Sequence, residues 1–297
     1  MEIRVLRYFL AVAREENISR AAEALHTAQP SLSRQLKELE EELGKTLFIR
    51  GRRRITLTEE GMFLRKRAEE IINLVDMTTN ALTMGDDVVT GDIYIGAGET
   101  HAVRFLTAVA KKMQALYPEV HYHIASGDTK DVTEWLDKGL IDFGLLFHPF
   151  DLSKYHSLPI SAVDTWGVLL LCDDPLAQQS SISLRELWGK PLIVSRQVLN
   201  TGRIEQWFRG SPIPLHIAAT YSLAFNGSLM VQDGLGYMLC LDHIIHTGGN
   251  GSLCFRPIAP AIESRTSVVW KKYQVFSKAA AKFLELMQAE VAADDRL

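Results

Sequence analysis

The chain has 297 residues, of which 47% are hydrophobic, and its formal net charge is −4. This length and apolar content are sufficient for two or three separate hydrophobic cores. The first residues lead directly into a charged amphipathic segment, and no apolar run approaches the length of a membrane span. We therefore expect a cytoplasmic protein without a signal peptide or membrane contact.

Charge is distributed unevenly along the chain. Residues 1–68 contain 14 Lys and Arg against 10 Asp and Glu, a charge of +4, which leaves −8 for the remainder. A basic segment on an otherwise acidic chain is typical of a surface that contacts nucleic acid.

The first 44 residues predict three short helices. Apolar side chains three and four residues apart predict a helix over 3–16, and Ser19 is the expected N-cap of a second over 20–25. Pro30 falls in the first turn of a third helix, which Gly44 would end. The exposed face of this third helix would present side chains suited to base edges and phosphates: Gln29, Ser31, Ser33, Arg34 and Lys37.

Four arginines follow the third predicted helix. Arg50, Arg52, Arg53 and Arg54 surround a glycine between two β-like runs, 46–49 and 55–57, and so predict an arginine-tipped hairpin, or wing. Such a wing can enter a minor groove, where the potential is most negative. A charge run alone is usually a solvated surface, but beside a helix-turn-helix pattern it favours binding of double-stranded DNA.

The order and spacing of these residues resemble the winged helix-turn-helix domain of LysR-type transcriptional regulators. The matching positions are Ala21-Ala22, Gln29 to Ser33, Leu39-Glu40, Leu43-Gly44, Leu47-Phe48, Arg50, Arg53, Leu57-Thr58 and Gly61, whereas Glu60 stands where alanine is common. The resemblance implies such a domain over residues 1–58. It also implies that the third helix and the wing contact DNA through Gln29, Pro30, Ser31, Ser33, Arg34, Lys37 and Arg53.

Residues 59–83 predict one long linker helix. Its apolar positions step by four and three residues, as in a heptad seam: Leu64, Ala68, Ile71, Val75, Thr78 and Leu82. The seam either packs on its own domain or associates with the same helix of a second chain. We favour self-association, which the family resemblance also implies, and expect residues 59–89 to be a dimerisation helix. A homodimer is expected, and also a homotetramer.

Residues 90–297 alternate between strand-like and helix-like segments. A first series (92–96, 103–116, 120–125, 132–138 and 141–147) and a second (166–172 to 236–241) each predict a parallel, doubly wound α/β sheet. The last strand and helix, 267–271 and 277–289, are expected to return to the first lobe. The lobes would then comprise 90–163 with 266–297, and 164–265, resembling the periplasmic-binding-protein-like effector-binding domain of the same regulators.

Sheets of this kind bind ligands beyond the carboxyl ends of their strands, near helix N-termini. This rule selects nine residues for an effector site: Thr100, His101, Ser126, Thr129, His148, Ser195, Arg196, Tyr221 and Ser222. Each hydroxyl could simply be a helix cap, but their convergence on one cleft favours a ligand. A small-molecule effector is expected, and a carboxylate is a candidate because Arg196 could pair with it.

Other chemistry has little support in the sequence. Cys172, Cys240 and Cys254 are odd in number and widely spaced, so reduced core thiols are expected. We identify no metal-ligand spacing, P-loop, complete dinucleotide fingerprint or nucleophile elbow, and expect neither a cofactor nor enzyme activity. The favoured function is a ligand-responsive transcriptional regulator that binds promoter DNA. The alternative is a small-molecule-binding protein or enzyme built on the α/β lobes, which would lack salt-dependent DNA binding.

Overall fold

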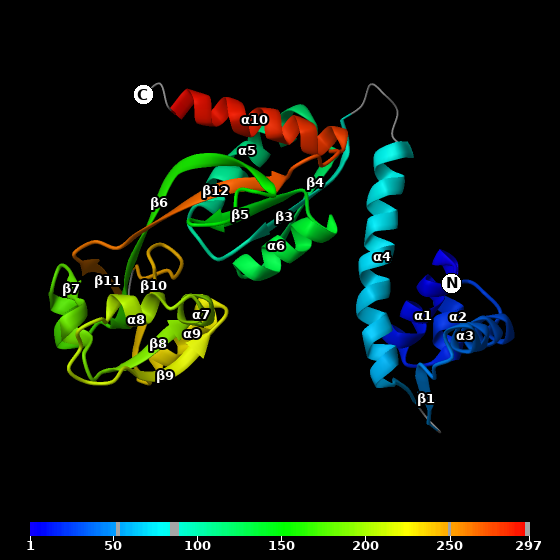
Figure 1. Ribbon diagram of the computed structural model, residues 1–297, viewed down its shortest axis with the longest axis horizontal. Helices are drawn as coiled ribbons and strands as arrows, with labels where there is room; N and C mark the ends of the chain where they lie inside the picture. The colour runs from blue at the N-terminus through cyan, green and yellow to red at the C-terminus, as the bar shows by residue number, and fades with distance from the viewer. Residues whose placement is uncertain (52–53, 84–88, 249–250, 295–297) are drawn as a thin grey trace. The chain divides into compact units, whose positions relative to one another are not determined.

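The computed structural model describes residues 1–51, 54–83, 89–248 and 251–294. The chain divides into two compact units, Met1–Asp86 and Asp87–Leu297 (Figure 1). Within the described residues, no helix combines the length and the apolar character needed to cross a membrane.

The N-terminal unit has the predicted three helices, hairpin and linker helix. Its elements are α1 (Ile3–Glu15), α2 (Ile18–Ala24), α3 (Gln29–Leu43), β1 (Phe48–Arg50), β2 (Ile55–Leu57) and α4 (Glu59–Thr83). One boundary prediction is wrong, because the N-cap of α2 is Asn17 rather than Ser19. The Asn17 side chain accepts hydrogen bonds from the backbone N–H groups of Ser19 and Arg20. The predicted end of α3 is confirmed at Gly44, which has a φ of 63°.

The linker helix α4 shares the core of the N-terminal unit. Ala68 is fully buried in that core, and Leu64 and Ile71 pack partly buried against it. This half of the predicted seam therefore packs on its own domain, since the helix bundle needs apolar cover on that side. Leu82 has no described side chain. Among the described side chains of α4, three large apolar ones are exposed: Met62, Phe63 and Leu74.

A tight contact joins the wing to the start of α4. The Thr58 hydroxyl donates to the carbonyl of Thr46 at 2.7 Å and accepts from the N–H of Gly61 at 2.9 Å. A Cβ at position 61 would lie 2.2 Å from the carbonyl oxygen of Leu47. Only glycine fits this close approach of two backbone segments.

The C-terminal unit consists of two α/β lobes. Lobe I contains β3 (Gly91–Ala97), α5 (Val103–Leu116), β4 (Val120–Ser126), α6 (Thr129–Lys138), β5 (Phe143–Phe147) and α10 (Lys278–Asp294). Lobe II contains η1 (Pro175–Gln178), β7 (Ile182–Ser183), η2 (Leu184–Leu187), β8 (Pro191–Ser195), α7 (Arg196–Asn200), α8 (Arg203–Trp207), β9 (His216–Tyr221), α9 (Ala224–Gln232), β10 (Tyr237–Leu241) and β11 (Leu253–Ala259). Two long strands, β6 (Tyr155–Leu171) and β12 (Glu263–Lys271), run between the lobes (Figure 1).

The sheet is mixed. The parallel pairing predicted for the first series is confirmed, whereas for the second series it is wrong for the opening strand, β6, which is antiparallel to β10. The main strand order is β4-β3-β5-β12-β6-β10-β8-β9, with β11 beside β6. Within each lobe β3 is parallel to β4 and β5, and β8 is parallel to β9 and β10. The crossing strands are antiparallel to each other and to their neighbours β5 and β10. Only the second half of β6 was predicted as a strand, because that half is a continuous apolar run. The first half alternates between buried and more exposed residues and lacks such a run.

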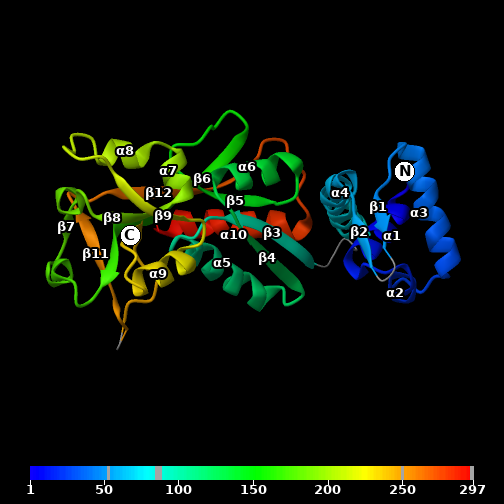
Figure 2. The same cartoon turned by 90° about the horizontal axis from the view of Figure 1, so that it is seen from below.

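Helices cover both faces of each lobe. In lobe I, α5 and α10 pack on one face around Phe143 and Phe283, while α6 packs on the other face through Val132 and Leu136. In lobe II, α7 and α8 cover one face and α9 the other (Figure 2). Four of these helices, α5, α6, α7 and α9, begin just after the parallel strands β3, β4, β8 and β9, and the candidate site residues lie at these junctions.

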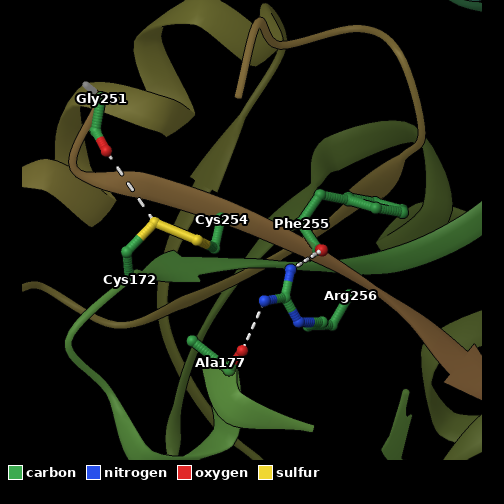
Figure 3. The surroundings of a disulfide bond; sticks show 6 residues. All are labelled: Cys172, Ala177, Gly251, Cys254, Phe255 and Arg256. Carbon is green, nitrogen blue, oxygen red and sulfur yellow. Dashed lines mark hydrogen bonds between the residues drawn. A yellow bond between two sulfur atoms is a disulfide. The ribbon is translucent and has the colours of Figure 1, made fainter. Parts of the chain in front are cut away.

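A disulfide contradicts part of the cysteine prediction. Cys172, just after β6, and Cys254, in the neighbouring strand β11, are joined by a disulfide with a Cα–Cα distance of 5.0 Å (Figure 3). The two residues are 82 positions apart, so only the antiparallel pairing of their strands brings them together. Cys240 is a free, buried thiol, as expected, and burial raises its pKa to about 12.

Candidate DNA-binding surface and effector cavity

The predicted recognition helix α3 presents its polar side chains to solvent. Gln29, Pro30, Ser31, Arg34 and Lys37 are exposed and Ser33 is half-buried, while the leucines on the opposite side are buried. The Nε of Arg34 donates to Glu38 at 2.8 Å, and Lys37 lies 3.3 Å from Glu41. The hydrogen bond to Glu38, and then its charge, raises the pKa of Arg34. Such exposed i,i+4 pairs are weak and can exchange for phosphate contacts.

The wing is a two-stranded hairpin. Phe48 pairs with Leu57 and Arg50 with Ile55, and the N–H of Gly51 donates to the carbonyl of Arg54 at 3.0 Å. The Arg54 guanidinium pairs with Glu16 at the end of α1, so this arginine has an intramolecular partner. Arg52 and Arg53 lie outside the described residues, as does the side chain of Arg50. The DNA contacts proposed for those three arginines stay predictions.

A cavity of about 750 Å³ is lined by residues of both lobes. Six of the nine predicted effector residues line it: Ser126, Thr129, Ser195, Arg196, Tyr221 and Ser222. Ser126, Ser195 and Tyr221 end strands, Ser222 follows one, and Thr129 and Arg196 begin helices, as the rule for α/β sheets predicts.

The other three predicted residues are not among the described residues that line this cavity. Thr100 is buried, and its hydroxyl donates to the Asp164 carboxylate at 2.6 Å. His101 lines a second, smaller cavity. The His148 ring forms a hydrogen bond with the Ser267 hydroxyl at 2.9 Å. These three residues were selected from the order of the strands, but the position of each side chain depends on tertiary contacts. Each lies against a polar partner or another cavity that the order of the strands does not reveal.

The polar groups of the large cavity include two cations available to a ligand. Arg196 and Lys130 have no hydrogen bond or ion pair through their side chains within the described part of the chain. By contrast, Asp128 and Asp131 are occupied in the capping box at the start of α6. The hydroxyls of Ser126, Ser195 and Ser222 are likewise unpaired among the described residues. The free groups of this cavity therefore favour an anion.

Within the described residues, three hydrogen bonds join lobe I to lobe II at or near the cavity. The side-chain amide of Gln197 donates to the Thr129 hydroxyl at 2.7 Å, and Arg203 donates to the carbonyl of His148 at 2.6 Å. The N–H of Ala224 donates to a carboxylate oxygen of Glu99 at 2.5 Å. The predicted site residues do not include Glu99, Gln197 or Arg203, although Glu99 lies in the segment after the first strand from which Thr100 and His101 were selected, and Gln197 directly follows Arg196.

The cavity wall also has a large apolar part, although Thr133, Asn200 and Thr201 line it as well. Its large apolar side chains are Phe147, Trp166, Val198, Leu223, Leu241 and Ile244. The indole N–H of Trp166 donates to the Ser264 hydroxyl at 2.9 Å, which fixes the ring in the wall. An apolar wall with a few polar groups is the usual composition of a small-molecule site.

The second cavity, of about 410 Å³, lies beside the crossing strand β6. The rings of His101 and His243 meet edge to face there, with centroids 4.8 Å apart. Burial raises the pKa of the neighbouring Asp164, while hydrogen bonds from Thr100 and from the backbone of His101 oppose that rise. Within the described residues, no group of three or more His, Cys, Asp or Glu side chains could hold a metal ion.

Comparison with known families identifies the class of protein. A family model described as "Bacterial regulatory helix-turn-helix protein, lysR family" matches residues 3–62, and the "LysR substrate binding domain" model matches residues 86–292. The chain belongs to the LysR family of transcriptional regulators, as the resemblance implied. It is a ligand-responsive transcriptional regulator with an N-terminal DNA-binding domain and a C-terminal effector-binding domain.

Individual relatives agree over almost the whole length. The chain is 30% identical to the Hca operon transcriptional activator HcaR of Escherichia coli K12, over 98% of this chain and 99% of that protein. It is also 30% identical to the HTH-type transcriptional regulator YwbI of Bacillus subtilis, over 96% and 95%. Among solved structures, CbnR complexed with its target DNA matches with a TM-score of 0.74 at 20% identity, over 97% of this chain and 99% of that one. At that identity the structural match establishes the fold alone.

Proposed function

We propose that this regulator binds promoter DNA through α3 and the wing, and that a small carboxylate in the large cavity controls it. In this proposal the protein acts in the cytoplasm by binding rather than by catalysis, and assembles into homodimers and homotetramers. The observation that carries the proposal is the combination of an exposed, polar α3 with a cavity whose free charged groups are cations.

DNA binding by α3 is supported by the two cations of its N-terminal half, Arg34 and Lys37, and by its uncapped start. The N-cap residue Ala28 makes no side-chain hydrogen bond, so the first amides of α3 can meet a phosphate. Arg34 and Lys37 are held only by exposed pairs, which phosphate or base contacts can replace. CbnR, which has the same fold, was solved in complex with its target DNA, and the same use of the fold is proposed for this chain.

A matched pair of arginines tests the recognition helix. Arg34 on α3 and Arg65 on α4 each bond a glutamate four residues later through Nε, at 2.8 and 3.0 Å. Arg34→Ala should weaken binding to a DNA fragment selected by the protein by about 1–3 kcal/mol, whereas Arg65→Ala should bind like the parent. Affinity is measured by fluorescence anisotropy over a range of salt concentrations. Equal losses in the two variants would mean that α3 is not the recognition element.

The carboxylate effector is supported by the position of Arg196. It begins α7 at the cavity wall, next to the unpaired hydroxyl of Ser195. A guanidinium can bind a carboxylate through two parallel hydrogen bonds, which suits this geometry. The apolar wall would then cover the uncharged part of the ligand.

Thermal unfolding tests effector binding. All five tryptophans lie in the C-terminal unit, so their fluorescence reports on that unit alone. A carboxylate at 100 times its Kd should stabilise the unit by about 2.7 kcal/mol. Arg196→Gln should abolish the shift, whereas Arg209→Gln, an exposed arginine that does not line the cavity, should retain it. Shifts that survive in Arg196→Gln would place the carboxylate elsewhere.

Self-association through α4 is supported by its exposed apolar side chains. Phe63 is 66% exposed and Met62 is 56% exposed, while the buried side of the helix is occupied by its own domain. Phe63→Glu should therefore reduce the molecular mass in sedimentation without unfolding the domain. An unchanged mass would assign assembly to other surfaces.

A further inference from the structure

The carboxylate of Glu99 occupies a position where helices attract anions. Glu99 follows β3 in lobe I, and one of its oxygens accepts a hydrogen bond from the N–H of Ala224, the first residue of α9 in lobe II. The N-cap of α9, Leu223, provides no side-chain hydrogen bond. The exposed amides and the dipole of a helix N-terminus favour a negative group there. Glu99 thus supplies from the opposite lobe the anion that α9 lacks locally.

The strand registers place a second polar region beside this contact. Ala97 of β3 lies opposite Ser126 of β4, and Ser195 of β8 lies opposite Tyr221 of β9. Two hydrogen bonds join the lobes at these strand ends. Glu99, after β3, accepts from Ala224, after β9, and Thr129, after β4, accepts from Gln197, after β8. At the first pair the cavity has the carboxylate of Glu99. At the second pair it has the cations Lys130 and Arg196 together with Asp128 and Asp131, whose carboxylates accept backbone N–H groups in the capping box of α6.

The two unpaired cations belong to the second region. Lys130 is in the first turn of α6 directly after Thr129, and Arg196 begins α7 directly before Gln197. Both line the cavity and both lack a side-chain partner in the described ranges. A ligand carboxylate finds free cations in this region, whereas the amide of Ala224 in the other region already has the carboxylate of Glu99.

We propose that Glu99 is a specificity-determining residue that restricts the cavity to monocarboxylates. The single carboxylate of the ligand binds near Arg196 and Lys130, and the end that approaches Glu99 is uncharged. A second carboxylate at that end meets a like charge that the helix N-terminus holds in place. This inference rests on the carboxylate effector of the proposed function and adds a limit on the charge of the ligand.

Matched acids provide the probes. Hexanoate and adipate have the same chain length and differ by one carboxylate. In the same way, 4-methylbenzoate has a methyl group at the para position where terephthalate has a second carboxylate. The parent protein should bind each monocarboxylate at least tenfold more tightly than its dicarboxylate counterpart in titration calorimetry. Glu99→Gln keeps the shape but not the charge, and should reduce that ratio at least fivefold.

Two further variants separate charge from shape. Glu99→Asp keeps the charge and should keep the discrimination, although the shorter side chain loses the bond to Ala224. Glu205→Gln, an exposed glutamate in lobe II that does not line the cavity, should behave like the parent. Equal affinity of the parent for both members of each pair overturns the inference but leaves the proposed function standing. Failure of all four acids to bind the parent overturns the proposed function and the inference with it.

Hydrogen exchange tests the contact itself without any ligand. Glu99→Ala should speed exchange in a peptide covering the start of α9 at least tenfold, because the Ala224 amide loses its acceptor. Exchange in α5 and α10 should be unchanged, which checks that lobe I remains folded. Parent-like exchange at α9 in Glu99→Ala overturns the assignment of Glu99 as the anion at this helix.

Discussion

Thr100 is expected to matter for stability rather than for effector binding. Its hydroxyl donates to Asp164 at 2.6 Å and accepts from the N–H of Ala102 at 3.0 Å. Thr100 is 8% exposed and Asp164 is 4% exposed, so water cannot readily replace either bond. Thr100→Val keeps the shape of the side chain and leaves both partners without this hydrogen bond.

The expected loss follows from the charge of the acceptor. A hydrogen bond to a charged group contributes about 1.5–3 kcal/mol, and an unpaired buried amide adds to the loss. For a unit of this size, a loss of about 2 kcal/mol lowers the melting temperature by about 4–8 °C. Thr107→Val is the matched control, because its exposed hydroxyl bonds only a carbonyl of its own helix. That control should change stability by less than about 0.5 kcal/mol.

The loss should also depend on pH. Burial raises the pKa of Asp164 above its ordinary value, and the bond from Thr100 partly offsets that rise. In Thr100→Val the pKa of Asp164 should therefore rise further. The destabilisation is then full at pH values well above this pKa, where the carboxylate is charged, and shrinks as pH falls and the carboxyl becomes protonated.

Denaturant unfolding followed by tryptophan fluorescence measures these effects in the full chain. The parent, Thr100→Val and Thr107→Val are compared at several pH values between 4 and 8, with carboxylate affinity as a second measurement. A Thr100→Val variant as stable as Thr107→Val at pH 8 would refute the reasoning. The reasoning would also be refuted if Thr100→Val lost more effector affinity than its loss of stability explains, because Thr100 would then act on the ligand.

Three further results are expected. Burial raises the pKa of Asp142 to about 6, so Asp142→Asn should stabilise the unit by up to about 3 kcal/mol above pH 7 and by little near pH 4, as measured by denaturant unfolding. Gly61→Ala should destabilise the N-terminal unit by about 1–3 kcal/mol in circular dichroism melting, since its Cβ would collide with the carbonyl of Leu47. Alkylation in denaturant without reductant should label only Cys240, and labelling of all three cysteines would contradict the disulfide.

Local patterns were sufficient to predict the elements that carry a continuous signal. Three local features predicted elements of the winged helix-turn-helix domain at nearly the observed residues. They are the leucine stripe of α3, the glycine that ends this helix and the two β-like runs around the arginines. Each of these depends on neighbours a few positions away, such as the left-handed conformation that suits Gly44. The rule for strand ends likewise found six residues of the cavity.

The tertiary structure decided which side of each strand end faces the cavity and which distant residues meet. Thr100 turns to Asp164 and Glu99 to Ala224, over separations of 64 and 125 residues that no local pattern encodes. The same holds for the antiparallel crossing strands and for the disulfide between β6 and β11. Helix periodicity and helix caps depend on residues that are close together in the sequence, so they can be predicted from it. The pairing of lobes and the partners of buried polar groups depend on packing of the whole chain.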